Sequence, residues 1–193
     1  MQGEVRIIAG QWRGRRLKVP DIQDLRPTPD RVRETLFNWL APVIANARCL
    51  DLFAGSGVLG FEALSRGASY VEMVDQSAEI IALLKAELES MGGANASIYR
   101  AVVPHQLHPA RQPFDIVFLD PPYQANLLLP CCHYLEENHY LANSAYIYLE
   151  ARENIKDNDL PPDWRLIKSK KAGQVHYHLV FRERNEKTTI TDR

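Results

Sequence analysis

The chain has 193 residues and a formal net charge of −1; 46% of its residues are hydrophobic and 24% are charged. These values are typical of one globular domain with a sizeable core, and they exclude a long disordered or collagen-like chain. Its longest apolar runs are too short to cross a bilayer, and Glu4, Arg6 and Arg13 interrupt the region where a signal peptide needs an apolar core. We therefore expect a cytoplasmic protein without a membrane partner.

The first segment is predicted to form a small β-hairpin. Apolar Val5 and Ile7 alternate with polar residues, the alternation resumes at Leu17 and Val19, and Gly14 lies near the turn. Two short strands are not stable alone, so we expect the hairpin to pack on the main domain or to close over a substrate.

Basic residues concentrate in this hairpin and near the other end of the chain. Local basic patches, rather than total charge, bind phosphates, so we expect contacts with a nucleic-acid backbone. A solvated face is the competing interpretation. The candidate residues are Arg13, Arg15 and Arg16 in the hairpin, and Lys170 and Lys171 near the other end.

After a proline-rich linker up to Pro29, apolar residues at helical spacing predict a helix over residues 30–40 with Asp30 as its N-cap. Strand and helix patterns then alternate, which predicts a mainly parallel sheet with helices on both faces. The expected strands are residues 48–53, 70–75, 97–101, 114–119 and 145–150, and the expected helices are residues 58–66, 78–91 and 127–138. Two last strands, 164–169 and 174–182, flank a turn with Gly173 and should form an antiparallel hairpin.

This order of elements predicts an α/β fold with a Rossmann-like, mostly parallel seven-stranded sheet that an antiparallel C-terminal hairpin closes. Such a hairpin distinguishes class I methyltransferases from dehydrogenases. We divide the chain into an N-terminal basic hairpin and linker over residues 1–29, a methyltransferase-like domain over residues 30–184 and an expected mobile tail over residues 185–193.

A glycine-rich turn follows the strand that contains Asp51. Gly55, Gly57 and Gly60 have the spacing G-x-G-x-x-G, which lets the backbone turn tightly and lets a ligand approach the next helix. Asp51 would repel the pyrophosphate of a dinucleotide, whereas it suits the ammonium and sulfonium groups of S-adenosylmethionine. We therefore favour this methyl donor over NAD; a turn without a ligand is the remaining alternative.

Asp75 ends the next predicted strand. A carboxylate at that place accepts hydrogen bonds from both ribose hydroxyls of an adenosine ligand. Glu72 lies on the same strand but points to the opposite face. The alternative role of Asp75 is to cap the helix that begins near Ser77.

The tetrapeptide Asp120-Pro121-Pro122-Tyr123 directly follows an apolar strand. Two prolines hold the acid and the aromatic ring on a rigid loop at the carboxyl edge of the sheet, where open α/β sheets bind ligands. The exocyclic amine of a base is a poor nucleophile, and Asp120 and the Pro121 carbonyl can accept its N–H bonds while Tyr123 stacks on the base. The loop therefore predicts methyl transfer to a base amine.

The remaining nucleophilic and metal-binding residue types predict no site. Cys49, Cys131 and Cys132 form no C-x-x-C pair, and close histidines such as His176 and His178 lack a further ligand at suitable spacing. We expect reduced structural thiols, structural or surface histidines, and no metal.

The motifs together resemble a known family. Residues 6–17 (RIIAGQWRGRRL) and 26–40 (RPTPDRVRETLFNWL), with the Asp51 turn and the Asp120 loop, resemble the bacterial small-subunit ribosomal RNA guanine-N2 methyltransferases of the RsmD type. The likeness extends from about Val5 to Phe181. It implies methyl transfer from S-adenosylmethionine to the N2 amine of a guanine in 16S rRNA, within a small ribosomal subunit or an assembly intermediate.

The resemblance also implies roles for single residues. Asp51, Phe53, Gly55, Gly57 and Asp75 correspond to cofactor positions, and residues 120–123 correspond to the catalytic loop. Many such enzymes read the adenine amine with an acid after the third strand, but this chain has none there, so we expect backbone groups near Val102 to bind adenine. Thr28 and Arg31 are expected to reach the carboxylate at the methionine end of the cofactor.

Three other functions share part of these features. A DNA adenine-N6 methyltransferase has the same loop but needs a target-recognition domain that this chain lacks. A nicotinamide oxidoreductase is opposed by Asp51 and the two prolines, and binding measurements with S-adenosylmethionine and NADH would distinguish it. A non-catalytic RNA-binding or assembly protein with the same fold would incorporate no methyl group into RNA.

Overall fold

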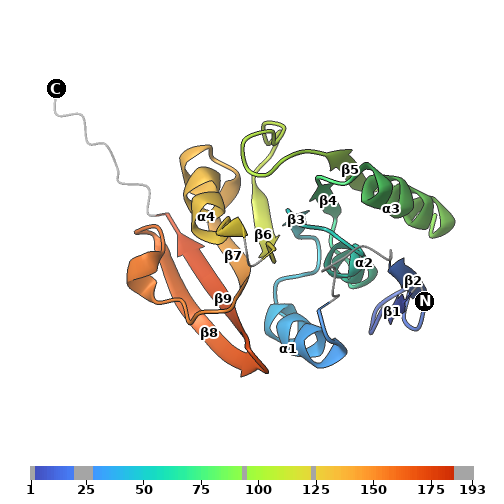
Figure 1. The fold of residues 1–193 in the computed structure, drawn as a ribbon, viewed down its shortest axis with the longest axis horizontal. Helices are drawn as coiled ribbons and strands as arrows, with labels where there is room; N and C mark the ends of the chain where they lie inside the picture. Colours follow the sequence, from blue (N-terminus) through green and yellow to red (C-terminus); the bar gives the residue numbers. More distant parts are fainter. Residues whose placement is uncertain (1–2, 20–27, 93–94, 123–124, 185–193) are drawn as a thin grey trace.

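A computed structural model of the protein describes residues 3–19, 28–92, 95–122 and 125–184 (Figure 1). The strands are β1 (Gly3–Arg6), β2 (Arg16–Val19), β3 (Arg48–Asp51), β4 (Tyr70–Asp75), β5 (Ala96–Arg100), β6 (Phe114–Leu119), β7 (Leu141–Ala151), β8 (Trp164–Ala172) and β9 (Val175–Glu183). The helices are α1 (Asp30–Leu40), α2 (Val58–Ser65), α3 (Ala78–Ser90) and α4 (Leu128–Glu137), with a 3₁₀ turn at Asp157–Asp159.

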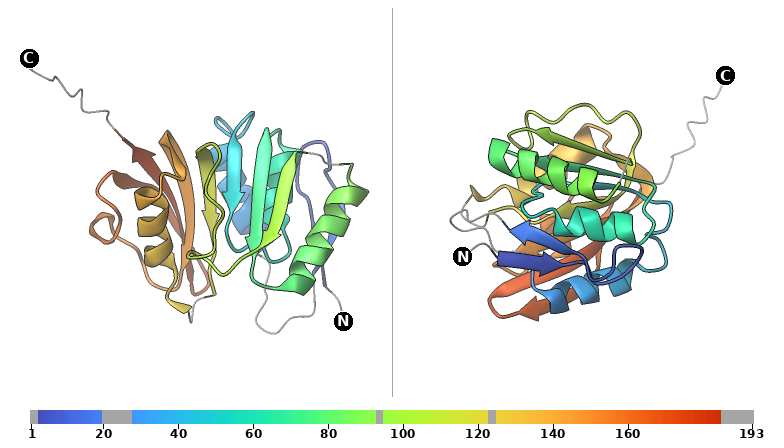
Figure 2. Two further views of the ribbon diagram at one scale, coloured as in Figure 1. Left: turned by 90° about the horizontal axis from the view of Figure 1, so that it is seen from above. Right: turned by 90° about the vertical axis from the view of Figure 1, so that its right-hand side faces the viewer.

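The main sheet has seven strands in the order β5-β4-β3-β6-β7-β9-β8. The first five of these pair in parallel, and β9 runs antiparallel between β7 and β8. Figure 2 shows the strands side by side across the molecule, from the β8 end to the β5 end. The predicted Rossmann-like sheet with an antiparallel C-terminal hairpin is confirmed.

Helices cover the two faces of the sheet. Side chains of α1, α2 and α3 belong to one buried cluster, and those of α4 belong to the other. Strand β6 has apolar side chains toward both clusters, as parallel strands buried on both faces require. In α1, Val32, Leu36, Phe37 and Leu40 are buried at helical spacing.

The start of α1 differs from the expectation. Pro29 is its N-cap and no side chain caps the helix, so Asp30 is the first helical residue rather than the cap. The Asp30 carboxylate instead pairs with Arg33 at 2.6 Å. This ion pair draws the acid along the helix and away from the free amides of the first turn.

The division into domains stays a prediction. Most of the expected linker and the whole expected tail, residues 185–193, lie outside the described residues. The predicted N-terminal hairpin exists as a separate two-stranded sheet of β1 and β2.

The β1–β2 hairpin is anchored on α2 through Glu62. This fully buried carboxylate accepts hydrogen bonds from the backbone N–H groups of Ile8 at 2.7 Å and Ala9 at 3.0 Å. It also pairs with Arg66 at 2.7 Å, and Ser65 donates to the Ala9 carbonyl at 2.6 Å. The hairpin therefore packs on the main domain, the first of the two expected arrangements.

Arg33 connects the hairpin anchor to the beginning of α1. Its guanidinium is fully buried, lies 3.7 Å from Glu62 and donates to the Thr28 carbonyl at 3.2 Å. Breaking a buried ion pair leaves an uncompensated charge and is strongly destabilising. The hairpin, α1, α2 and the residues just before α1 therefore share one buried polar network.

Two hairpin glycines provide a matched test of this docking. Gly10 and Gly14 both have a φ of 84°. A Cβ at Gly10 would overlap the Ser65 carbonyl, whereas nothing lies within 4 Å of a Cβ at Gly14. Gly14→Ala should cost about 1–2 kcal/mol, the penalty of a left-handed non-glycine residue. Gly10→Ala should cost clearly more, because the hairpin must also move off α2.

Urea unfolding of both variants, with hydrogen exchange at the Ile8 and Ala9 amides, measures this difference. Equal destabilisation with equal protection of these amides would show that the hairpin does not depend on the contact with Ser65.

Candidate functional site at the carboxyl edge of the sheet

Acidic side chains mark the ends of four parallel strands. Asp51 and Asp75 are the last residues of β3 and β4, Asp120 directly follows β6, and Glu150 is the residue before the end of β7. The residues two positions before Asp51, Asp120 and Glu150 all belong to the core cluster that α1, α2 and α3 cover. Because side chains alternate along a strand, these three acids point to that same face.

Asp51 lies at the bottom of this edge with 3% of its surface exposed. Its carboxylate accepts a hydrogen bond from the backbone N–H of Gly60 at 3.2 Å. Burial raises the pKa of Asp51 to about 7, and the charge of Asp75 adds to the effect. The amide of α2 offsets only part of this penalty.

The glycine-rich turn brings its backbone close to neighbouring elements. Gly55 and Gly57 have positive φ values of 50° and 73°. A Cβ at Gly57 would overlap side chains of α2 and α3, and one at Gly60 would lie 2.7 Å from the Met73 sulfur on β4. Each glycine is therefore required by the backbone or by packing, as the motif predicts.

Asp75 holds the turn and the start of α3 in place. Its Oδ2 accepts from the Gly55 N–H at 3.0 Å, and its Oδ1 accepts from the Ser77 N–H at 2.8 Å. The N-cap of α3 is Ser77, whose own hydroxyl accepts from the Ile80 N–H. Capping is therefore not the role of Asp75.

Glu72 points to the other face of the sheet, as expected. It accepts hydrogen bonds from the hydroxyls of Tyr70 at 3.2 Å and Tyr99 at 3.1 Å. These contacts leave Asp75 as the acid of β4 that faces the glycine-rich turn.

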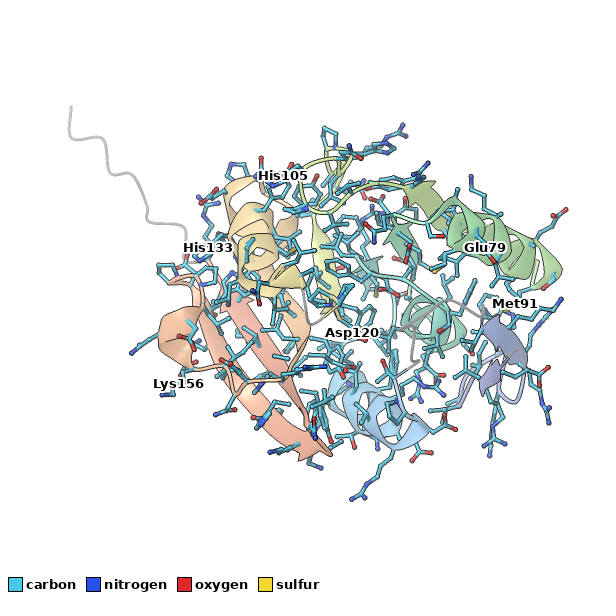
Figure 3. The ribbon with its side chains drawn as sticks, viewed as in Figure 1. Glu79, Met91, His105, Asp120, His133 and Lys156 are labelled. Carbon is cyan, nitrogen blue, oxygen red and sulfur yellow. The ribbon has the colours of Figure 1, made fainter. Side chains whose placement is uncertain are left out.

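Asp120 lies near the middle of the molecule in Figure 3. Although part of the residue reaches the surface, burial raises the pKa of its carboxyl group well above the usual value, and the charges of Glu150 and Asp51 raise it further. A hydrogen bond with the Thr28 hydroxyl opposes this shift. The following Pro121 is buried and Pro122 is exposed.

Thr28 and Tyr148 both donate to the same oxygen of Glu150. The distances from their hydroxyls to Glu150 Oε1 are 3.2 Å and 2.7 Å. Sequence analysis missed Glu150 and Tyr148, although the recurrence of an acid at the ends of these strands was a signal for Glu150. It expected Thr28 to bind a cofactor carboxylate, whereas the structure places this hydroxyl between two carboxyl groups of the protein.

The other expected cofactor residues lie at different depths. Phe53 is half-buried against the α4 cluster, and Arg31 is exposed on α1. Val102 is 50% exposed, and its backbone N–H donates to Gln106 Oε1 at 3.0 Å. Gln106 therefore holds the amide that was expected to contact adenine, and it too was missed. Tyr123 lies outside the described residues.

The hairpin arginines differ in their contacts. Arg13 is exposed. Arg15 donates to the Ser90 carbonyl at 2.7 Å, and Arg16 pairs with Glu4 at 2.8 Å. The predicted basic run is therefore only partly directed toward solvent.

The second basic cluster lies along β8, the edge strand of the main sheet. Lys170 and Lys171 are both exposed, and the Lys170 ammonium lies 5.9 Å from the centre of the Trp39 ring. Charged residues on an edge strand also prevent pairing with another chain. The position of these lysines is thus compatible with either role.

Among the described residues, no three His, Cys, Asp or Glu side chains are arranged to hold a metal ion. Cys49, Cys131 and Cys132 are free and buried, and burial raises the pKa of Cys131 to about 12. No helix in the described ranges combines the length and apolar character needed to cross a membrane.

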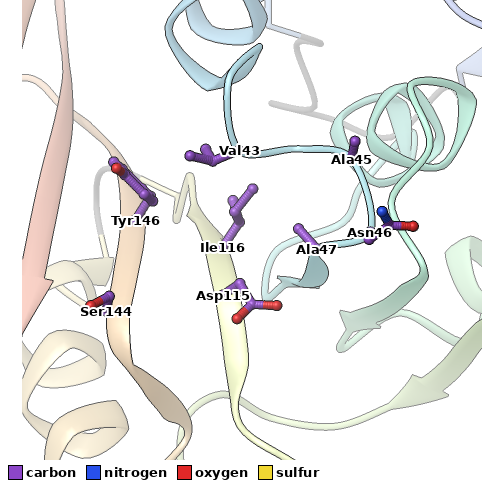
Figure 4. A pocket seen from close by; sticks show the side chains of 8 residues that line it. All are labelled: Val43, Ala45, Asn46, Ala47, Asp115, Ile116, Ser144 and Tyr146. Atoms are coloured by element: carbon purple, nitrogen blue, oxygen red, sulfur yellow. The ribbon is translucent and has the colours of Figure 1, made fainter.

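A cavity of about 300 Å³ opens at the opposite, amino edge of the strands (Figure 4). Its lining includes Ala47 just before β3, Asp115 at the start of β6, and Ser144 and Tyr146 on β7. Asp115 accepts a hydrogen bond from the Arg48 backbone at 2.8 Å, which fastens β6 to β3. None of the acids of the carboxyl edge takes part in this cavity, so we do not assign it to the site.

The acids at the carboxyl edge select the charge of a ligand. Asp51, Asp75, Asp120 and Glu150 would repel a pyrophosphate and attract a cationic group. The sulfonium and ammonium groups of S-adenosylmethionine match this donor set. The fold and this edge together define the class I, Rossmann-like methyltransferases.

Comparisons with known proteins agree with this class. The model of the family described as "Conserved hypothetical protein 95" matches residues 5–181. The chain is 47% identical over 181 residues to Ribosomal RNA small subunit methyltransferase D of Escherichia coli K12, covering 94% of this chain and 91% of that protein. It is 46% identical to the protein of the same name from Haemophilus influenzae, covering 92% and 94%. A solved structure, "Putative methyltransferase yhhF from Escherichia coli", matches with a TM-score of 0.86 and 46% identity, covering 95% of this chain and 100% of that one.

The chain therefore belongs to this family, the RsmD family of methyltransferases.

The raised pKa of Asp51 predicts a dependence of stability on pH. Because its value in the folded protein is about 7 rather than 3.8, its ionisation destabilises the fold as the pH rises from about 4 through 7. Asp51→Asn cannot ionise, so its stability relative to the wild type should increase over this range by about 2–4 kcal/mol and then level off. Urea unfolding at a series of pH values measures the difference. Asp163→Asn, at an exposed position, is the control, and parallel curves for Asp51→Asn and the wild type would contradict the assignment.

Proposed function

We propose that this protein transfers a methyl group from S-adenosylmethionine to the N2 amine of a guanine in 16S rRNA, within a small ribosomal subunit or an assembly intermediate in the cytoplasm. The observation that carries the proposal is the position of Asp120 and its two prolines beside Asp51 and Asp75, at one edge of a methyltransferase sheet. The 47% identity with a ribosomal RNA small subunit methyltransferase supports the RNA substrate.

On this proposal the cofactor lies over the glycine-rich turn. Asp75 binds the ribose hydroxyls, Gly55 and Gly57 let the backbone approach, and Asp51 provides negative charge below the cationic end. Phe53 and the backbone at Val102 contact the adenosine part, for which Gln106 must release the Val102 amide. When bound, S-adenosylmethionine supplies a methyl group made electrophilic by the positive sulfur.

The residues around the methionine end divide into two roles. Arg31 remains a candidate to bind the cofactor carboxylate. Thr28 lies between Asp120 and Glu150, so a third carboxylate beside it would meet like charge. We therefore place Thr28 in the catalytic hydrogen-bond network and leave Arg31 as the carboxylate ligand.

The Asp120 loop acts on the target base. Asp120 and the Pro121 carbonyl accept the two N–H bonds of the amine and direct its lone pair toward the methyl group, while Pro122 keeps the loop extended and Tyr123 stacks on the ring. The hairpin arginines Arg13, Arg15 and Arg16 and the β8 lysines Lys170 and Lys171 contact the surrounding RNA phosphates. A base within a folded RNA must be flipped into this site.

Methyl transfer provides the direct test of this function. The wild-type protein, labelled donor and undermethylated small subunits should give one methylated guanine, located by mass spectrometry of RNA fragments. Asp120→Ala should reduce the rate on the order of a hundredfold, because it removes an acceptor that acts in the transition state. Donor affinity measured by calorimetry should stay nearly constant.

Glu153→Ala, an exposed change near the same edge, is the control and should keep the wild-type rate. A methyl group on adenine of DNA would support the adenine-N6 alternative. RNA binding without any transfer would support the non-catalytic one.

The role of the hairpin is tested by the salt dependence of RNA binding. Replacement of Arg13, Arg15 and Arg16 by Ala should make the slope of log affinity against log salt shallower by about two to three units if each contacts a phosphate. Thermal unfolding of the same variant is needed, because Arg15 and Arg16 also hold Ser90 and Glu4. An unchanged slope would move the RNA contact to β8, where Lys170→Ala with Lys171→Ala is the matched variant.

A further inference from the structure

Two carboxyl groups adjoin at the end of neighbouring strands. Leu119 of β6 pairs with Leu149 of β7 in a parallel register, so Asp120 and Glu150 form the next pair at the carboxyl edge. Glu150 is only 4% exposed. Two adjacent carboxyl groups with little access to water are not both ionised at low cost, so the pair tends to hold a proton.

The Thr28 hydroxyl bridges this pair. It lies 3.2 Å from Glu150 Oε1 and also hydrogen bonds to Asp120. A hydroxyl has one proton to donate and can accept as well. When Thr28 donates to Glu150, its oxygen is therefore available to accept a proton from a protonated Asp120.

Tyr148 and Arg33 hold the two ends of this bridge. The Tyr148 hydroxyl donates to Glu150 Oε1 at 2.7 Å, which fixes the carboxylate. Arg33 donates to the Thr28 carbonyl at 3.2 Å, which fixes the threonine. The alignment from Asp120 through Thr28 to Glu150 is therefore supported from β7 and from α1.

We propose that Glu150 is a positioning residue that, through the Thr28 hydroxyl, receives the proton that Asp120 takes from the amine. This inference rests on the proposed methyl transfer. As the nitrogen forms its bond to the methyl carbon, the carbon–sulfur bond breaks with its electron pair left on sulfur, and the amine loses one proton. Asp120 accepts that proton, gives it to Thr28 Oγ1, and the Thr28 hydroxyl proton passes to Glu150. Asp120 thereby returns to the ionised form that the next substrate needs.

The other titratable groups around the pair are also defined. Asp51 at the end of β3 faces Asp120, and Tyr148 lies beside Glu150 with Tyr177 of β9 behind it. Burial and the charge of Glu150 raise the pKa of Tyr148 well above its usual value. The tyrosine therefore stays a donor at neutral pH and does not compete for the proton.

Two substitutions should shift the titration of Asp120 in opposite directions. Glu150→Gln keeps an oxygen for Thr28 and Tyr148 but removes a like charge, so Asp120 should titrate at lower pH. Thr28→Val keeps the shape but removes a hydrogen bond that favours the ionised acid, so Asp120 should titrate at higher pH. Carboxyl carbon NMR of the ligand-free protein measures both shifts, with the Asp120 signal identified by its loss in Asp120→Asn.

The same variants are then tested in methyl transfer to small subunits. Both should lower kcat on the order of tenfold with little change in KM, because proton removal is impaired and RNA binding is not. The acid limb of the pH profile should move down in Glu150→Gln and up in Thr28→Val. Thr28→Ser should restore kcat and the limb, and the control Glu153→Gln should match the wild type.

The outcomes separate the two proposals. No transfer by the wild-type protein would overturn the proposed function and the relay together. Transfer by the wild type, with titration of Asp120 and acid limbs unmoved in both variants, would overturn the relay alone. If Glu150→Gln does not fold, Thr28→Val and Thr28→Ser decide the same question.

Discussion

Like charge collected at one edge of the sheet is the constraint on which this site depends. The parallel strands β3, β4, β6 and β7 all end there, and each brings an acid. The protein offsets their repulsion with backbone amides of Gly55, Gly60 and Ser77 and with two hydroxyls. The remaining negative potential is free to act on a cationic ligand, which links the energetic cost of the site to its binding selectivity.

The N-terminal hairpin is structurally coupled to this edge. Glu62 binds the hairpin backbone and faces Arg33, which in turn holds the carbonyl of Thr28. One buried ion pair therefore connects the proposed RNA-binding hairpin with the network beside Asp120. Such a connection gives a physical route by which RNA contact at the hairpin affects the reacting centre, without any large movement of the sheet.

Much of the site could be anticipated because its residues follow directly from strand ends. Asp51, Asp75 and Asp120 each close an apolar run, and parallel strands of one sheet must end at the same edge. Residues that act through partners distant in sequence were not found in this way. Thr28 and Glu150 are 122 positions apart, and no local pattern indicates that they hydrogen bond. The expected ligand of Thr28 was accordingly different from the partner it has.

The sequence by itself determined the order of strands and helices, the antiparallel closing hairpin and the positions of the glycines, because periodicity and turn chemistry are local properties. Tertiary structure alone decided which charges meet. It paired Arg33 with Glu62 and Asp30, directed Arg15 to Ser90 instead of outward, and brought Glu150 beside Asp120. These contacts depend on the sheet register and on the packing of α1 and α2 against it, and both arise only when segments far apart in the chain come together.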